Sequence, residues 1–420
     1  MCPYVPRIAI VGGGPSGLTL GLLLHKRGIP STIFELRPIP SAQELAKPSG
    51  MLDLHVESGL AALRECGIFD EFVALTGECA ESMTIIDKQG KILWADEGTV
   101  EYRPEISRHA LSNLLVSHLP AGSIHWDTKI VGATSTTTAS GNTEVVLDLG
   151  AGGKETFDLV IGADGAWSKT RPLLTAVKPH YSGTHNITIT LTDATKKYPH
   201  LSEWVGAGSM FTLADRKGLV SHRGAQDSIR LYLAVNTDDE DFAQTSGFAG
   251  KTAAQAKEQL LGDDGWYATW APLHRELIAA ACDEETHDNP GGTLDIKGLY
   301  MFPVDHTWAH KPGATLIGDA AHLMTPWSGE GVNLAMWDSL ELSRAIAQAA
   351  ETPGAETASA YESILDPLVR DFERGMFERT SKKAVKTLRN KKMMFDNENG
   401  SQAMLDFFQS IAAGFGPPPP

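Results

Sequence analysis

Gly12-Gly13-Gly14-Pro15-Ser16-Gly17 follows directly on the apolar run Ile8–Val11. The first glycine of this G-x-G-x-x-G pattern permits a tight turn, the second lets backbone approach a pyrophosphate, and the third allows a helix to pack closely on a strand. The leucine-rich segment 18–28 that follows predicts a helix whose N-terminal amides and dipole face those phosphates. We therefore expect a phosphate-binding turn made of Gly12, Gly14, Pro15, Ser16 and Gly17.

A second β-type run, Ser31–Phe34, is followed by Glu35, Leu36 and Arg37. A carboxylate at this strand end is placed to accept hydrogen bonds from ribose hydroxyls, while it would repel a 2′-phosphate. The sequence therefore disfavours NADP as the tightly bound nucleotide and leaves NAD and FAD. We assign Glu35, Leu36 and Arg37 to the nucleotide site.

Two more clusters place glycine and acid at the end of a short β-type run, in segments 158–165 and 314–322. This pattern is expected where buried parallel strands end against a nucleotide. We expect Asp164, Gly165, Gly318 and Asp319 to belong to one cofactor site assembled from both ends of the chain. For Asp319, a role as a helix N-cap stays open beside this one.

The chain resembles the class A flavoprotein monooxygenases, the para-hydroxybenzoate hydroxylase-like group, in three segments. These are the G-x-G-x-x-G segment near the start, Asp164-Gly165 in mid-chain and Gly318-Asp319 late in the chain. The resemblance implies an α/β fold, with a Rossmann-like FAD-binding domain of the GR2 type and an inserted β-rich substrate domain. It also implies tightly bound FAD, with Asp319 at its ribityl and pyrophosphate part.

Segment 326–333 precedes a helical pattern that begins at Leu334. Glycines before a helix start expose backbone N–H groups, and the positive end of the helix favours an anion above it. In a flavoprotein that anion is the N1–C2=O edge of the reduced ring. We expect the ring to lie along this loop, a surface loop being the alternative, with contacts from Pro326, Gly329, Gly331, Val332 and Asn333.

Segments 50–55, 103–111 and 318–333 are similar to the TetX-like tetracycline-inactivating monooxygenases. This resemblance implies that Asp53 and Arg108 contact the flavin. A fixed guanidinium near the ring would also stabilise negative charge that develops there. A surface ion pair of Arg108 with Glu105 or Asp53 is the alternative, and His55 could be structural or catalytic.

Alternating β-type runs in segments 83–94, 187–191 and 229–235 predict the β-rich substrate domain. We place the FAD-binding domain in residues 1–80, 104–178 and 296–350, and the substrate-binding domain in 81–103 and 179–295. Residues 351–413 carry a helical pattern, expected as a C-terminal helix, and the proline-rich end 414–420 is expected to be disordered.

The chain shows no HExxH, paired-carboxylate, Ser/His/Asp or metal-ligand pattern, so we expect no bound metal and assign the chemistry to the cofactor. The resemblance implies that NADPH or NADH reduces FAD, that O2 adds to form the C4a-hydroperoxide, and that the distal oxygen passes to a phenol or enolate carbon. No catalytic side chain is assigned, although Arg108 and Pro326 are expected near the ring. With one dinucleotide fingerprint, the nicotinamide donor is expected to bind transiently.

Segment 220–224 resembles a substrate-side strand of the tetracycline-inactivating enzymes, in which a histidine touches the drug. We therefore expect His222 to contact substrate, a turn histidine without a role being the alternative, and name Arg223, Phe211 and Met210 as further contacts. The expected substrate class is a polyketide or alkaloid-type aromatic with a phenolic or enolic group, tetracyclines included.

Two other functions stay open. A flavin-dependent halogenase shares this fold, but its WxWxIP segment is missing, because segment 265–270 has the wrong spacing. A non-catalytic or redox-sensing FAD protein would carry the same glycines.

Composition limits the partners. The net charge of −16 over 420 residues disfavours nucleic acid and anionic membranes, which demand basic patches. The basic run in segment 382–392 is expected to be a solvated helix face. Four scattered cysteines without metal-like or CxxC spacing indicate a reducing compartment, so we expect a cytoplasmic monomer acting on a small molecule with O2.

Overall fold

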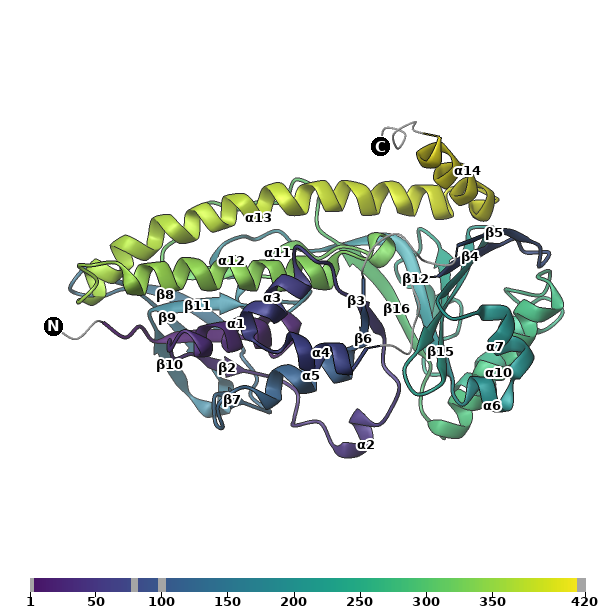
Figure 1. Ribbon diagram of the computed structural model, residues 1–420, viewed down its shortest axis with the longest axis horizontal. Helices are drawn as coiled ribbons and strands as arrows, with labels where there is room; N and C mark the ends of the chain where they lie inside the picture. The colour runs from purple at the N-terminus through teal and green to yellow at the C-terminus, as the bar shows by residue number, and fades with distance from the viewer. Residues whose placement is uncertain (1–3, 77–81, 97–102, 414–420) are drawn as a thin grey trace.

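The computed structural model describes residues 4–76, 82–96 and 103–413, and the predicted tail 414–420 lies outside this range. Figure 1 shows two halves side by side: a nucleotide-binding half built on the N-terminal strand, and a half dominated by one large sheet. The long helix α13 (Ala358–Phe395) runs over both halves. No helix in the described ranges has the length and apolar character needed to cross a membrane.

A five-stranded parallel sheet forms the centre of the nucleotide-binding half. Its order is β17 (Ala314–Leu316), β11 (Leu159–Gly162), β1 (Ile8–Val11), β2 (Thr32–Phe34) and β7 (Ile124–His125). All four residues of β1 and of β11 are buried, as expected for parallel strands covered on both faces. Because the strands are parallel, their carboxyl ends meet at one edge of the sheet, where all three predicted glycine clusters lie.

Smaller elements complete this half. The antiparallel sheet β8–β10 and the two-stranded ribbon β3–β6 lie beside the parallel sheet, and helices surround it. The strands are β3 (Met51–Asp53), β6 (Glu105–Ser107), β8 (Gly132–Thr137), β9 (Thr143–Asp148) and β10 (Lys154–Phe157). The helices are α1 (Pro15–Lys26), α2 (Ala42–Leu45), α3 (Gly59–Cys66), α4 (Phe69–Ala74), α5 (Arg108–Ser117), α11 (Asp319–His322) and α12 (Gly331–Glu351), with 3-10 turns at Gly150–Gly152, Arg171–Leu173 and Pro326–Ser328.

The second half is a seven-stranded sheet with the order β16-β12-β15-β14-β13-β4-β5. Its strands are β4 (Met83–Ile86), β5 (Ile92–Asp96), β12 (His180–Leu191), β13 (Ser209–Ala214), β14 (Lys217–Gly224), β15 (Ser228–Asn236) and β16 (Asp295–Met301). Its helices are α6 (Ala194–Lys197), α7 (Pro199–Val205), α8 (Phe242–Thr245), α9 (Ala253–Leu261) and α10 (Pro272–Asp288). These helices cover one face of the sheet, which we call the helix-covered face, through an apolar core that includes Met210, Leu231 and Leu277.

The opposite face, which we call the inner face, carries a smaller core shared with the C-terminal helices. Here Phe395 of α13 and Met404 of α14 (Gly400–Ala412) pack against Leu213 and Ala234. The predicted C-terminal helix is thus two helices, one of which reaches from the nucleotide half to the large sheet.

One predicted boundary is corrected by the strand pairing. Residues 296–301 were assigned to the FAD-binding domain, but they form β16, an edge strand that pairs with β12 of the seven-stranded sheet. A short β-type run shows no sign in sequence of which sheet it joins, because that choice depends on partners far away in the chain.

Candidate functional site

The phosphate-binding turn has the backbone geometry that its glycines predict. Gly12 has a φ of +113°, and a Cβ added there would lie 2.2 Å from the carbonyl oxygen of Ala163. A Cβ on Gly17 would lie 2.0 Å from the carbonyl oxygen of Gly12. By contrast, a Cβ on Gly14 would meet no atom within 4 Å. Gly12 and Gly17 are therefore required by the protein's own packing, whereas Gly14 faces open space.

Gly14 is also the N-cap of α1, and no side chain caps this helix end. The first N–H groups of α1 therefore point toward the same open space, with the positive end of the helix dipole behind them. This arrangement fits the pyrophosphate of a dinucleotide.

Glu35 follows β2 and is 5 % exposed. One of its carboxylate oxygens accepts the Gly13 N–H at 2.5 Å, and the other accepts the N–H and the Nε–H of Arg37 at 2.8 and 2.7 Å. Burial alone would raise the pKa of Glu35, but the bonds from Arg37 and Gly13 hold it below its usual value. The ionised carboxylate keeps lone pairs for a ribose, while Leu36 lies exposed beside it.

The Gly318-Asp319 cluster is held in place by a buried carboxylate, that of Asp338, which sequence reasoning missed. Asp338 of α12 is fully buried, accepts the Gly318 N–H at 3.1 Å and lies 2.5 Å from Nε2 of His322. The surrounding protein partly desolvates the Asp319 carboxyl and raises its pKa, while the charges of His322 and Arg108 oppose the rise. Asp319 nevertheless stays exposed, as expected for a group on the wall of a ligand site.

Asp164 in the middle cluster organises its own loop. Its carboxylate accepts the hydroxyls of Ser168 and Thr170 at 2.6 and 2.8 Å and the Lys169 N–H at 2.6 Å, while Gly165 turns the chain with a φ of +74°. The loop then delivers Arg171, which is 5 % exposed and donates to the carbonyls of Ala166 and Ala320. Arg171 therefore ties the middle cluster to the late one, a link that sequence reasoning did not predict.

Residues 325–333, which we call the ring-side loop, include the segment predicted to lie along the ring and meet the ribbon β3–β6. The side chain of Asn333 donates to the carbonyl of Asp53 at 2.9 Å and accepts the His55 N–H at 2.8 Å. A Cβ on Gly329 would lie 3.9 Å from the Asp53 carboxylate, which itself lies 3.1 Å from Nε2 of His55. Gly331 starts α12 and Val332 packs against the core. Asp53, Gly329 and Asn333 are therefore brought together.

Arg108 is the first residue of α5 and directly follows β6, the other strand of this ribbon. Its backbone N–H donates to the carbonyl of Gly50 at 2.9 Å, and the hydroxyl of Ser107 caps the helix by accepting the Ala110 N–H at 3.1 Å. Its side chain is exposed and its charge acts on Asp319. Residues far apart in the chain thus meet at one edge of the parallel sheet.

The inner face of the large sheet carries His222, which lies between two partners. Its Nδ1 lies 2.6 Å from Oγ of Ser209 on β13, and its Nε2 lies 2.6 Å from Oε2 of Glu105 on the ribbon. Phe211 lies on the same face, in the cluster that contains Trp327 of the ring-side loop. The inner face therefore contacts the ribbon β3–β6 and the ring-side loop.

Two predicted substrate contacts lie on the helix-covered face. Met210 is fully buried under the helices, and Arg223 donates to the carbonyls of Ser202 and Gly206. Successive strand residues point to opposite faces, so neighbours of Phe211 and His222 in sequence face away from them. We correct the expectation for Met210 and Arg223 accordingly.

Comparison with known proteins shows which family the chain belongs to. Residues 6–375 match the family described as FAD binding domain. The chain belongs to that family. The flavoprotein is 32 % identical to the monooxygenase penA of Penicillium thymicola, with 96 % of this chain and 98 % of penA covered. It is 31 % identical to the monooxygenase asqM of Emericella nidulans, with 97 % and 98 % covered.

The flavoprotein is also related to the 3-amino-4-hydroxybenzoate 2-monooxygenase PtmB3 of Streptomyces platensis. The two chains are 28 % identical, with 89 % of this chain and 87 % of PtmB3 covered. The chain contains the FAD-binding domain, and the two relatives that match nearly its whole length are monooxygenases. The chain is therefore an FAD-dependent monooxygenase.

Solved structures show the same fold. Klebsiella pneumoniae HpxO complexed with FAD and uric acid has a TM-score of 0.71 at 18 % identity, covering 97 % of this chain and 95 % of that one. A salicylate hydroxylase substrate complex has a TM-score of 0.68 at 18 % identity, covering 97 % and 94 %. The tetracycline destructase Tet(55) has a TM-score of 0.60 at 17 % identity, covering 94 % and 98 %. The expected likeness to tetracycline-inactivating enzymes therefore holds for the fold, while the sequence relatives at 31 to 32 % identity are fungal monooxygenases.

The residues of the flavoprotein fit FAD chemically. Gly14 leaves the space that a pyrophosphate needs, Glu35 offers acceptors for ribose hydroxyls, and Arg108 supplies a positive charge that acts on Asp319. In the part of the chain that the structure describes, no group of three or more His, Cys, Asp or Glu side chains could hold a metal ion.

The flavoprotein also uses α13 in a way that sequence reasoning missed. Along one side of this helix, Thr387 and Asn390 each donate at 2.8 Å to backbone carbonyls of the ring-side loop, those of Thr325 and Trp327. Lys383 and Lys386 donate at 2.8 and 2.9 Å to Glu330, which is 3 % exposed at the N-cap of α12. The basic run was predicted to be a solvated face, but these two lysines neutralise a buried carboxylate.

Proposed function

We propose that this monooxygenase hydroxylates an electron-rich aromatic ring that carries a hydroxyl, enol or amino group, with NADPH or NADH as reductant. The observation that carries the proposal is the His222 contact to Glu105, because it joins the inner face of the large sheet to the ribbon that bears Asp53 and is followed directly by Arg108. The relative named for 3-amino-4-hydroxybenzoate and the structural neighbours with uric acid and salicylate hydroxylase in their names support an aromatic substrate.

Different residues of this chain have different roles in the proposed reaction. The α1 N-terminus, Glu35 and Asp319 hold the cofactor, while Arg108 and the N–H groups at the start of α12 stabilise negative charge beside it. FAD, when bound there, supplies oxygen activation and transfer.

Ser209, His222 and Glu105 form a hydrogen-bonded chain that can take a proton from a substrate hydroxyl. The Ser209 hydroxyl would pass the proton to Nδ1 of His222, while Glu105 accepts from Nε2 and stabilises the charged ring. Removal of a phenolic proton makes the ring carbons more electron-rich. We therefore propose that His222 acts on the substrate through Ser209.

Tyr232 is a further proposed contact that sequence reasoning did not name. It is paired with Val220 on the inner face and is half-buried. A Cβ added to Gly50, beside the ribbon, would lie 3.4 Å from its hydroxyl. A phenolic hydroxyl at this position can orient a polar aromatic ring.

The test is a screen of phenolic, anilinic and enolic compounds, tetracyclines included, with purified protein, FAD, NADPH or NADH, and air. We expect substrate-stimulated oxidation of the nicotinamide and a product sixteen mass units heavier, the mass of one oxygen. A non-catalytic or redox-sensing flavoprotein would show no stimulation with any compound, which would overturn the proposal. Turnover of the tetracyclines in this screen tests whether the enzyme inactivates these antibiotics.

We further propose that the enzyme acts as a monomer in the reducing cytoplasm. Cys66 and Cys282 are buried free thiols, and burial raises the pKa of each to about 12, which makes them unreactive. Light scattering of the purified protein measures the oligomeric state.

A further inference from the structure

His55 lies between two carboxylates beside the ring-side loop. It follows the end of β3 by two residues and is 7 % exposed. Its Nε2 lies 3.1 Å from Oδ2 of Asp53, and its Nδ1 lies 3.8 Å from Oε2 of Glu330. Both ring nitrogens therefore face an acid, one on the ribbon β3–β6 and one at the N-cap of α12.

The backbone of His55 is held on both sides. Its N–H donates to Oδ1 of Asn333 at 2.8 Å, and its carbonyl accepts the Leu60 N–H at 3.0 Å. The Asn333 amide also donates to the carbonyl of Asp53 at 2.9 Å, so one side chain of α12 fixes the backbone of both residues. With the main chain fixed, the place of the imidazole depends on its rotamer and on the two acids.

Glu330 faces the Nδ1 side of the imidazole, and α13 holds Glu330 in place. Oε1 of Glu330 accepts from Lys383 and Lys386 at 2.8 and 2.9 Å, while Oε2 faces His55. Burial alone would raise the pKa of Glu330, but the two lysines hold it below its usual value. An ionised carboxylate therefore lies on the side of the imidazole away from Asp53.

Asp53 is the less restrained of the two acids. Its side chain is 34 % exposed, and among the described residues the imidazole of His55 is the one hydrogen-bond partner of its carboxylate. A carboxylate oxygen accepts hydrogen bonds, so Nε2 of His55 is assigned as the donor. This bond keeps the carboxylate beside Gly329 of the ring-side loop, because without it the exposed group would be free to turn toward water.

We propose that His55 is a positioning residue, which keeps the Asp53 carboxylate beside the ring-side loop and so sets the reduction potential of the bound flavin. The inference rests on the flavin site of the proposed function, but not on its substrate. A negative charge near the ring destabilises the reduced form, which is itself negatively charged, and so lowers the potential. Loss of the His55 bond releases Asp53 toward water, and the potential rises.

The test is the midpoint potential of FAD bound to the full-length protein, measured against a reference dye during reduction. The measurement needs no substrate, so its outcome is independent of the hydroxylation screen. The side chain of His55→Asn is too short to replace Nε2, whereas the amide of His55→Gln can donate from that position. We expect His55→Asn to favour the reduced flavin about fivefold, an upward shift of about 20 mV for a two-electron couple, and His55→Gln to keep the parent value. An unshifted His55→Asn protein, or equal shifts in both variants, would contradict the role of the bond.

A double-variant cycle shows whether His55 acts through Asp53. Asp53→Asn removes the charge itself and should raise the potential at least as much as His55→Asn does. The double variant should match Asp53→Asn, because His55 then has no charge to hold in place. Additive shifts, or no shift in Asp53→Asn, would overturn the proposal. Asp53→Asn remains informative if His55→Asn does not fold, because Asp53 is partly exposed.

A second histidine–carboxylate contact provides one control. His118 is the C-cap of α5, at the end of the helix opposite Arg108, and its Nε2 lies 2.9 Å from Glu71. His118→Asn breaks this contact with the same substitution but away from the ring-side loop. It should keep the parent potential, and a shift as large as that of His55→Asn would contradict a local effect.

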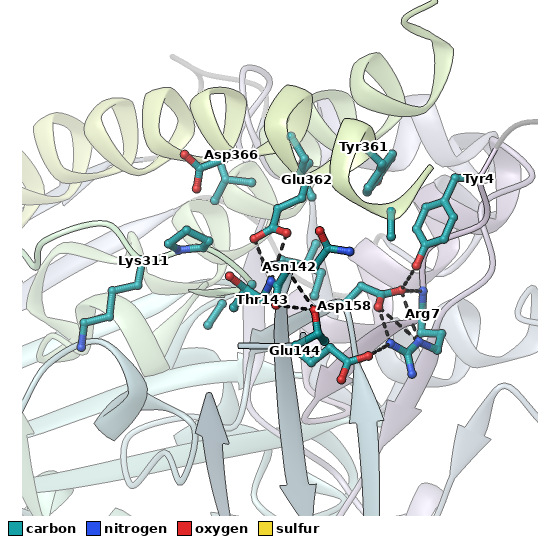
Figure 2. A pocket seen from close by; sticks show the side chains of 18 of the residues that line it. Tyr4, Arg7, Asn142, Thr143, Glu144, Asp158, Lys311, Tyr361, Glu362 and Asp366 are labelled. Carbon is teal, nitrogen blue, oxygen red and sulfur yellow. Dashed lines mark hydrogen bonds and ion pairs between the residues drawn. The ribbon is translucent and has the colours of Figure 1, made fainter. Parts of the chain in front are cut away.

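Glu362→Gln is the control for loss of a negative charge. Figure 2 shows Glu362 of α13 directed toward Thr143, whose N–H it accepts at 3.1 Å, in a cavity lined also by the residues that directly precede β1, β11 and β17. The cofactor residues follow the carboxyl ends of these strands, so one strand length, on the order of 10 Å, lies between. Glu362→Gln should therefore keep the parent potential, and a rise equal to that of Asp53→Asn would show that the place of the charge is irrelevant and overturn the proposal.

Discussion

Single glycines have different tasks in the phosphate-binding turn, and this difference is testable. Gly14 faces open space with an ordinary φ of −79°, so Gly14→Val should leave folding intact. The added side chain would occupy the space expected for the pyrophosphate, and we expect FAD affinity to fall by about tenfold or more. Absorbance of the purified variant at flavin wavelengths, with circular dichroism of the same sample, measures both effects.

Gly17→Val is the matched comparison. Its Cβ would lie 2.0 Å from the carbonyl oxygen of Gly12, so this variant should lose folded protein rather than cofactor alone. A well-folded Gly14→Val protein that retains full flavin would contradict the assignment of the site.

His310 predicts a pH-dependent contribution to stability. Burial alone would lower its pKa, but hydrogen bonds to Glu373 and Asp366 raise it above the usual value. The stabilisation is therefore complete below the pKa of about 6.5 in the unfolded chain and is lost as pH rises through the higher folded pKa. His310→Gln should cost about 2 kcal/mol of unfolding free energy at pH 6 and less at pH 9.

Urea unfolding of both proteins across this pH range measures that difference. A cost that stays constant with pH, or grows toward pH 9, would show that the charged imidazole does not contribute.

At the scale of elements, α13 holds the ring-side loop. Thr387→Val with Asn390→Ala removes the two bonds to the carbonyls of Thr325 and Trp327 without changing charge. Each bond is worth about 1 kcal/mol, so a looser loop should weaken FAD binding by up to about tenfold. The rate of flavin release into excess apoprotein acceptor, followed by fluorescence, is the measurement.

Lys392→Ala, an exposed substitution on the same helix, should release flavin at the parent rate. Identical release from the double variant would mean that α13 has no influence on the loop.

Elements also show what sequence can and cannot predict. The strand β1 and the turn after it are predictable, because the roles of Gly12 and Gly17 depend on local backbone geometry. The partners Asp338 and Arg171 were not predicted, since the contact of Arg171 with Ala320 joins residues 149 positions apart. The strand that contains Met210 was predictable, but the face of the sheet on which its side chain lies was not. A shift of the strand by one residue moves every side chain to the opposite face.

Across the whole molecule, the two halves meet where the inner face of the large sheet reaches the ribbon β3–β6. Tyr232→Phe removes a hydroxyl from that face, so we expect KM for the substrate to rise about tenfold, with unchanged FAD content. Steady-state kinetics with the substrate found by the screen provide the measurement.

Tyr198→Phe is the matched control on the other side of the sheet, where its hydroxyl donates to Glu284 at 2.9 Å. This variant should keep the parent KM. If Tyr198→Phe raised KM as much as Tyr232→Phe, the substrate would not lie at the inner face.

The function proposed for the whole molecule is the transfer of one oxygen atom from O2 to an aromatic substrate. The most direct measurement is the product mass after turnover under ¹⁸O2 in ordinary water, with the reduced nicotinamide as electron donor. We expect a gain of eighteen mass units, from one ¹⁸O atom, in a product formed only by flavin-loaded protein. Nicotinamide oxidation that yields hydrogen peroxide but no labelled product, from any compound of the screen, would contradict it.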